Sequence, residues 1–166
     1  MKLLKCTLYC AISGIVGFLF GRLASRWPMN PDKGLFRCYK FENNGVIYEN
    51  LNIRKWQKRV PDMSRIAPFL MPPKNLSGDY AERLPTMIQE TCVAEITHVV
   101  VSILGLRCLK IWPGMGGIVV TAVFIIVFNV PYILIQRYNR PRLIRLQCKL
   151  QKKKEMREGE VCVCLS

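Results

Sequence analysis

Apolar residues along the chain gather into three long runs, and most charged residues lie between these runs. The third run, 115–136, holds 22 residues without a charge, and the first two extend over about 3–24 and 91–110. A helix needs roughly 20 apolar residues to cross the hydrocarbon core of a bilayer, whereas a soluble core scatters its apolar residues at short intervals. The pattern therefore predicts an all-α fold, a small integral membrane protein of one domain with about three transmembrane helices.

The first run has two interpretations, a retained transmembrane helix or a cleaved signal peptide. The basic start, MKLLK, suits both, but Arg22 makes a poor cleavage region. We therefore predict a retained span. Gly14, Gly17 and Gly21 offer a face of small residues on this span, against which another helix can pack closely.

The loop after the first run, 25–90, is basic and rich in proline. Ile53, Trp56 and Val60 lie on one helical face of a basic stretch within it, which is typical of an amphipathic helix in a headgroup layer. The stretch 67–75 is too short and too rich in proline to span, and it is predicted to dip into the membrane interface. The loop therefore predicts interfacial helices on the membrane surface.

The tail, 137–166, is also basic. A second surface helix is predicted to begin at Pro141, because proline suits the first turn of a helix. Its apolar edge would be formed by Leu143, Leu146 and Leu150.

Lys and Arg outnumber Asp and Glu by 25 to 11, which gives a net charge of +14. In a soluble chain this surplus would suggest a nucleic-acid partner, but basic residues that flank membrane spans account for it without one. With three spans, the loop and the tail share one side of the membrane, and together with Arg22 at the loop's start they hold 21 of the 25 basic residues. We therefore predict that loop and tail are cytoplasmic, in contact with anionic membrane lipids, and that nucleic acid is not a partner.

The eight cysteines form no CxxC pair, and the chain has a single histidine. Neither zinc spacing nor a glycine-rich phosphate loop is present, so no metal and no cofactor are expected. A thiol inside an apolar span behaves as a small hydrophobe, and we interpret the cysteines as reduced and structural.

Two polar residues of the second and third spans fall at one depth. The spans form a hairpin about a turn near Pro113, with His98 15 residues before it and Asn129 16 residues after it. At about 1.5 Å per residue, both lie roughly 22–24 Å from the turn. Glu95 is one helical turn from His98 on the same face, and Pro131 is predicted to kink the third span beside Asn129.

An ionised carboxylate inside a bilayer costs on the order of 2–3 kcal/mol even on lenient scales, so such residues commonly mark function. The alternative is a Glu95–His98 hydrogen bond that merely joins helices. Further polar residues at the same level favour a site, and we predict that they bind substrate: Gln136, Arg137, Asn139, Arg140 and Arg142. Closely spaced guanidinium groups suit a ligand with several phosphates or carboxylates.

These groups fit acyl transfer to an alcohol. His98 would act as general base, Glu95 would orient it, and Asn129 would support the oxyanion. The arginines would hold the acidic part of the acyl donor. A non-enzymatic membrane protein that binds anionic lipid or a partner through its basic segments is the main alternative, and a prenyl-type methyltransferase is a third.

Three motifs in order, NIRKWQKRVPD, ETCVAEITH and NVPYILIQRYNRPRL, resemble the bacterial glycosyl-4,4'-diaponeurosporenoate acyltransferase family over about 35–143. The resemblance implies an O-acyltransferase of carotenoid biosynthesis in the bacterial cell membrane. Its substrates would be a fatty acyl donor, as a thioester or a lipid, and a lipid-linked sugar whose hydroxyl is esterified. Trp56, in the first motif, joins the predicted binding residues.

Overall fold

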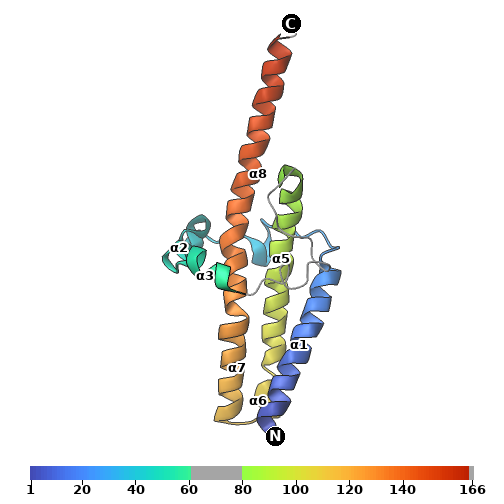
Figure 1. Cartoon of the computed structure of the whole chain (residues 1–166), viewed down its shortest axis with the longest axis vertical. Helices are drawn as coiled ribbons and strands as arrows, with labels where there is room; N and C mark the ends of the chain where they lie inside the picture. Colours follow the sequence, from blue (N-terminus) through green and yellow to red (C-terminus); the bar gives the residue numbers. More distant parts are fainter. Residues whose placement is uncertain (61–79, 165–166) are drawn as a thin grey trace. The chain divides into compact units, whose positions relative to one another are not determined.

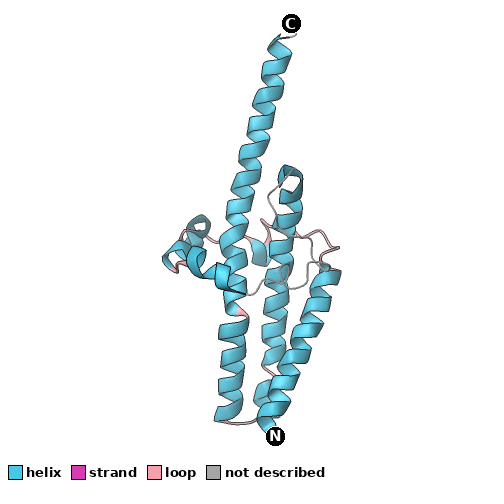
Figure 2. Ribbon diagram, in the orientation of Figure 1, coloured by secondary structure: helices cyan, strands magenta, loops and turns pink. Residues whose placement is uncertain are grey.

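The computed structural model describes residues 1–60 and 80–164, and within these ranges helices and loops make up the chain, without strands (Figure 2). The prediction of an all-α fold is thereby confirmed. Three helical stretches in the described residues are long and apolar enough to cross a membrane: Lys2–Ala24, Ala81–Ile111 and Met115–Arg157. The predicted number of helices long and apolar enough to span a membrane is therefore also confirmed.

The first two stretches differ in how well the sequence predicted their bounds. Helix α1 (Lys2–Ala24) agrees with the predicted 3–24. Helix α5 (Tyr80–Gly105) begins 11 residues before the predicted start at 91, and after a break it continues as the short α6 (Cys108–Ile111). Leu84 and Ile88, one turn apart, are buried, so apolar packing extends the helix beyond the run that predicted it.

The third stretch is divided at Asn129. Helix α7 (Met115–Phe128) ends there and α8 (Val130–Cys164) begins after it. The kink predicted from Pro131 is therefore confirmed. A helix start at Pro141 is wrong, because α8 continues through this proline. Pro141 removes only one backbone hydrogen bond, and the surrounding Leu, Arg, Gln and Lys residues are strong helix formers.

The chain divides into two compact units. Unit 1 combines Met1–Arg37 with Gln89–Arg137, and unit 2 combines Cys38–Ile88 with Tyr138–Ser166. Helices α5 and α8 contribute residues to both units.

In unit 1, glycines bring α1 close to α5 (Figure 1). A Cβ atom added at Gly17 would lie 2.2 Å from a methyl group of Val101, and one added at Gly21 would lie 2.9 Å from Oγ1 of Thr97. A Cβ atom at Gly14 would meet no neighbour within 4 Å. The predicted small-residue face is thus confirmed for two of its three glycines.

Unit 2 contains the short helices η2 (Lys40–Gly45), α2 (Ile47–Asn50), α3 (Ile53–Trp56) and η3 (Gln57–Arg59). The amphipathic helix predicted through Val60 is therefore two short pieces. Ile53 is buried, as an inward apolar face requires, and the Trp56 indole donates to the Leu51 carbonyl at 2.9 Å. The predicted interfacial stretch 67–75 lies outside the described residues.

Candidate functional site

His98 of α5 and Asn129, the residue between α7 and α8, contact each other in unit 1. Nδ1 of His98 lies 3.1 Å from Oδ1 of Asn129. Asn129 is only 2% exposed, and its Nδ2 donates to the Phe124 carbonyl at 2.9 Å. The depth that residue counting gave to His98 and Asn129 therefore agrees with the structure.

This pair of hydrogen bonds fixes the protonation pattern of the neutral imidazole. A carbonyl accepts only, so the Asn129 group that faces Phe124 must be the NH₂ group. Oδ1 then faces His98 and requires a proton on Nδ1, which leaves the lone pair on Nε2. Within the described part of the chain, Nε2 makes no hydrogen bond. His98 is only half-buried, so this nitrogen is available to a substrate.

Tyr132 of α8 stacks on the His98 ring, with ring centroids 4.6 Å apart and an interplanar angle of 9°. The hydrogen bond to Asn129 holds the imidazole at Nδ1, and the stacked Tyr132 ring further restricts rotation of the imidazole. Tyr132 was not among the residues predicted for the site. Its signal was available, because Tyr132 lies three residues after Asn129 in the third motif.

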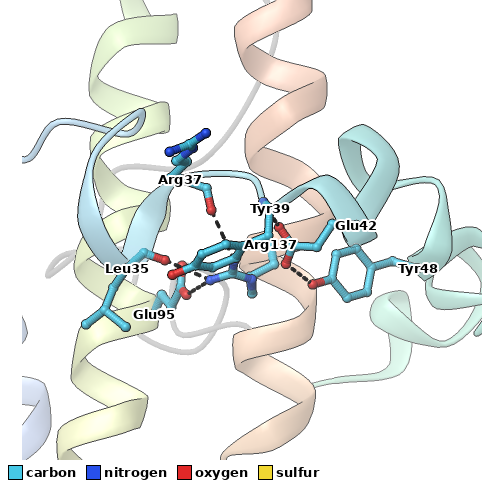
Figure 3. A network of polar contacts seen from close by, with 7 residues as sticks. All are labelled: Leu35, Arg37, Tyr39, Glu42, Tyr48, Glu95 and Arg137. Carbon is cyan, nitrogen blue, oxygen red and sulfur yellow. Dashed lines mark hydrogen bonds and ion pairs between the residues drawn. The ribbon is translucent and has the colours of Figure 1, made fainter.

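Glu95 of α5 pairs with Arg137 of α8, with Oε1 and Nη1 2.5 Å apart (Figure 3). The carboxylate is buried, and the Arg137 side chain is only 14% exposed. This ion pair stands in place of the expected hydrogen bond between Glu95 and His98. A permanently charged guanidinium compensates a buried carboxylate better than a neutral imidazole does.

Arg137 also fastens the segment that follows the first span. It donates to the carbonyls of Leu35 at 2.9 Å and Arg37 at 3.2 Å, on either side of the end of helix η1 (Gly34–Phe36). Figure 3 shows the guanidinium between these carbonyls and Glu95. Its donors are engaged by protein groups, which favours a positioning role over the predicted contact with the acyl donor.

Gln136 is half-buried in unit 1, and its amide makes no hydrogen bond to the described residues. The remaining predicted binding residues belong to unit 2: Trp56, Asn139, Arg140 and Arg142. Arg140 is buried at 3% exposure. Arg142 is 43% exposed, lies 4.7 Å above the Tyr138 ring, donates to the Tyr138 hydroxyl and pairs with Glu49 at 3.4 Å.

Possible metal ligands are not grouped in residues 1–60 and 80–164, where no three His, Cys, Asp or Glu side chains converge. Nδ1 of His98 is held by Asn129, and the Glu95 carboxylate is paired with Arg137. The chemistry that this arrangement offers is proton transfer at Nε2 of His98.

Comparison with known proteins adds an independent finding. The family model of glycosyl-4,4'-diaponeurosporenoate acyltransferase matches residues 32–149. Enzymes of this name from Staphylococcus aureus strains Newman and USA300 are each 27% identical over 161 residues, which cover 93% of this chain and 95% of the relative. No solved structure matches the chain. The resemblance drawn from the three motifs is confirmed.

Proposed function

The chain belongs to the glycosyl-4,4'-diaponeurosporenoate acyltransferase family and is an acyltransferase, and from this premise we propose that it esterifies the sugar hydroxyl of a glycosylated carotenoid or a similar lipid. The observation that carries the mechanism is the chain of hydrogen bonds from the Phe124 carbonyl through Asn129 to His98. It supplies an oriented base whose free nitrogen is Nε2.

In the proposed reaction, Nε2 of His98 removes the proton of the sugar hydroxyl while the hydroxyl oxygen attacks the acyl carbonyl carbon. A C–O bond forms, and the carbonyl electron pair moves onto oxygen. When the tetrahedral intermediate collapses, the bond to the thiol or alcohol of the donor breaks. The leaving group takes the proton back from the imidazolium, so charge and protons balance without a redox step.

Asn129 and Tyr132 are assigned to positioning. Both ends of the Asn129 amide are engaged, so we no longer assign this residue to the oxyanion. Gln136 is the better candidate for a donor to the substrate, because its amide is unengaged in the described residues and lies one helical turn beyond Tyr132.

Arg137 and Glu95 are assigned to holding the segment around Leu35 and Arg37. Asn139, Arg140 and Arg142 belong to unit 2, and their contact with the acidic part of the acyl donor stays a prediction; of the three, Arg142 is partly exposed. Trp56 remains a proposed substrate contact through its indole face.

We further propose that the three helices lie in the bacterial cell membrane, with loop and tail cytoplasmic. Large apolar side chains of α1 are exposed along its length, which lipid contact would explain. They include Leu4, Leu8, Ile12, Ile15, Leu19 and Leu23. The acceptor's lipid tail would then reach His98 from within the bilayer.

The test is expression in a host that makes the glycosylated carotenoid and lacks an acyltransferase for it, followed by mass spectrometry of extracted lipids. The wild-type chain should convert the glycoside to a fatty acyl ester. His98→Gln should lower the rate by about 10²–10⁴-fold, because the general base is lost.

Tyr9→Phe is the matched control, since it removes a hydrogen bond of unit 1 at Leu104, between one and two helical turns from His98 along α5. It should retain nearly full activity. Absence of any new ester with the wild-type chain would overturn the acceptor class. Full activity of a folded His98→Gln variant would overturn the mechanism.

A further inference from the structure

Three cysteines of unit 1 converge outside the site. Cys6 and Cys10 lie one helical turn apart on α1, and Cys108 begins α6. Sγ of Cys10 lies 3.5 Å from Sγ of Cys108. The thiols of Cys6 and Cys108 each lie about 4 Å from the other residue's carbonyl, at 4.0 and 3.9 Å.

Cys108 begins α6, and Figure 1 shows α6 at the same end of the helices as the N-terminus. Arg107 and Lys110 flank Cys108 and are exposed, which is typical of a helix end at a headgroup layer. The Tyr9 hydroxyl donates to the Leu104 carbonyl at 3.1 Å and holds α1 against α5 at this level.

The sequence led us to expect reduced cysteines; for two of them we now propose the oxidised state, a disulfide between Cys10 and Cys108 that ties the first helix to the turn between the other two. The helices already bring the sulfur atoms into contact, so closing the bond needs a movement of about 1.5 Å between atoms that end at roughly 2.05 Å. Under the predicted orientation this end of unit 1 faces the outside of the cell, where disulfides persist.

The oxidant is an external protein disulfide. The partly exposed Cys10 attacks one of its sulfur atoms as a thiolate and forms a mixed disulfide, which releases the first thiol of the oxidant. Cys108 then attacks Sγ of Cys10 and releases the second thiol. Two cysteines lose two electrons and two protons, and the oxidant gains both.

The bond joins residues that are 98 apart in the chain. It closes a long loop and so removes many conformations from the unfolded chain. Cys6 fills the space beside it as a buried apolar residue at 0% exposure. Reduction should therefore loosen α1 from the helical hairpin without touching His98.

The test uses the full-length protein purified from membranes without reductant, with free thiols blocked during lysis. Trypsin cuts after Lys5, Arg22, Arg107 and Lys110, so the disulfide should appear as peptide 6–22 joined to peptide 108–110, two hydrogens lighter than the separate thiol peptides. Reductant should separate them and lower the apparent melting temperature of the wild-type protein by several degrees.

Peptide 6–22 contains both α1 cysteines, and two matched variants identify which of them forms the bond. Cys6→Ser should retain the joined peptide, and Cys10→Ser should lose it and melt at the same temperature with or without reductant. Blocked, unjoined Cys10 and Cys108 in the wild-type protein would overturn the proposal. A joined peptide that survives in Cys10→Ser but not in Cys6→Ser would overturn it as well.

Discussion

The two ends of unit 1 hold its helices together by different chemistry. At the end near the N-terminus, neutral groups meet: the sulfur atoms of Cys10 and Cys108, and the Tyr9 hydroxyl with a backbone carbonyl. At the other end, the buried charges of Glu95 and Arg137 pair. Neutral groups cost little to bury, whereas a buried charge is costly unless its partner stays in place.

Substitutions at the two ends should therefore differ in their effect. The neutral end can lose one contact and keep its packing. The charged end cannot lose one partner without leaving the other charge uncompensated. The oriented histidine lies within a helical turn of Glu95, so substitutions at this end should affect both stability and activity.

The largest effect should come from Arg137→Gln, which leaves Glu95 buried without its cation. We expect the free energy of unfolding in detergent micelles to fall by about 3–5 kcal/mol. Adding Glu95→Gln removes the unpaired charge and should recover part of the lost free energy of unfolding. Tyr9→Phe, at the neutral end, should cost only about 0.5–1.5 kcal/mol. Equal losses at both ends would contradict the comparison.

Asn129→Ala should come next, because it frees the imidazole to rotate and to change tautomer. We expect kcat to fall on the order of 100-fold while KM changes little, since the residue positions the base and does not contact substrate. The control is Ser102→Ala, which removes a hydroxyl bonded to the His98 carbonyl at 2.7 Å. A KM effect without a kcat effect would assign Asn129 to substrate binding instead.

Gly17→Leu should follow, because its side chain would enter the space that Val101 fills. We expect a loss of about 1–3 kcal/mol, measured as a lower unfolding free energy in micelles. Gly14→Leu, on the same helix with no neighbour within 4 Å, should be nearly neutral. If both variants lose the same stability, α1 does not pack through Gly17.

The smallest effect should be that of Tyr132→Leu, which removes the aromatic ring stacked on His98. Such stacking contributes about 0.5–1.5 kcal/mol, so kcat should fall by no more than roughly 10-fold. Tyr132→Phe keeps the ring and should retain more activity than Tyr132→Leu. The reverse order, measured as ester formation per folded protein, would shift the role of Tyr132 from its ring to its hydroxyl.

Much of the site could be predicted because, in a helical hairpin, the depth of a residue is proportional to its distance along the chain from the turn. Counting from Pro113 placed His98 and Asn129 together, and they lie 3.1 Å apart. The partner of Glu95 could not be found in this way. Residues three apart on a helix suggested His98, but Arg137, 42 residues away, satisfies the charge.

The sequence by itself determined the membrane-span candidates and the helix break at Asn129, since both depend on local apolar length and on a missing proline N–H. Only the tertiary structure decided that Asn129 forms a hydrogen bond with His98, that Arg137 forms an ion pair with Glu95, and that Cys10 contacts Cys108. Such choices depend on which of several polar partners lies nearest once helices are packed, and local periodicity carries no information about the rotation of one helix against another.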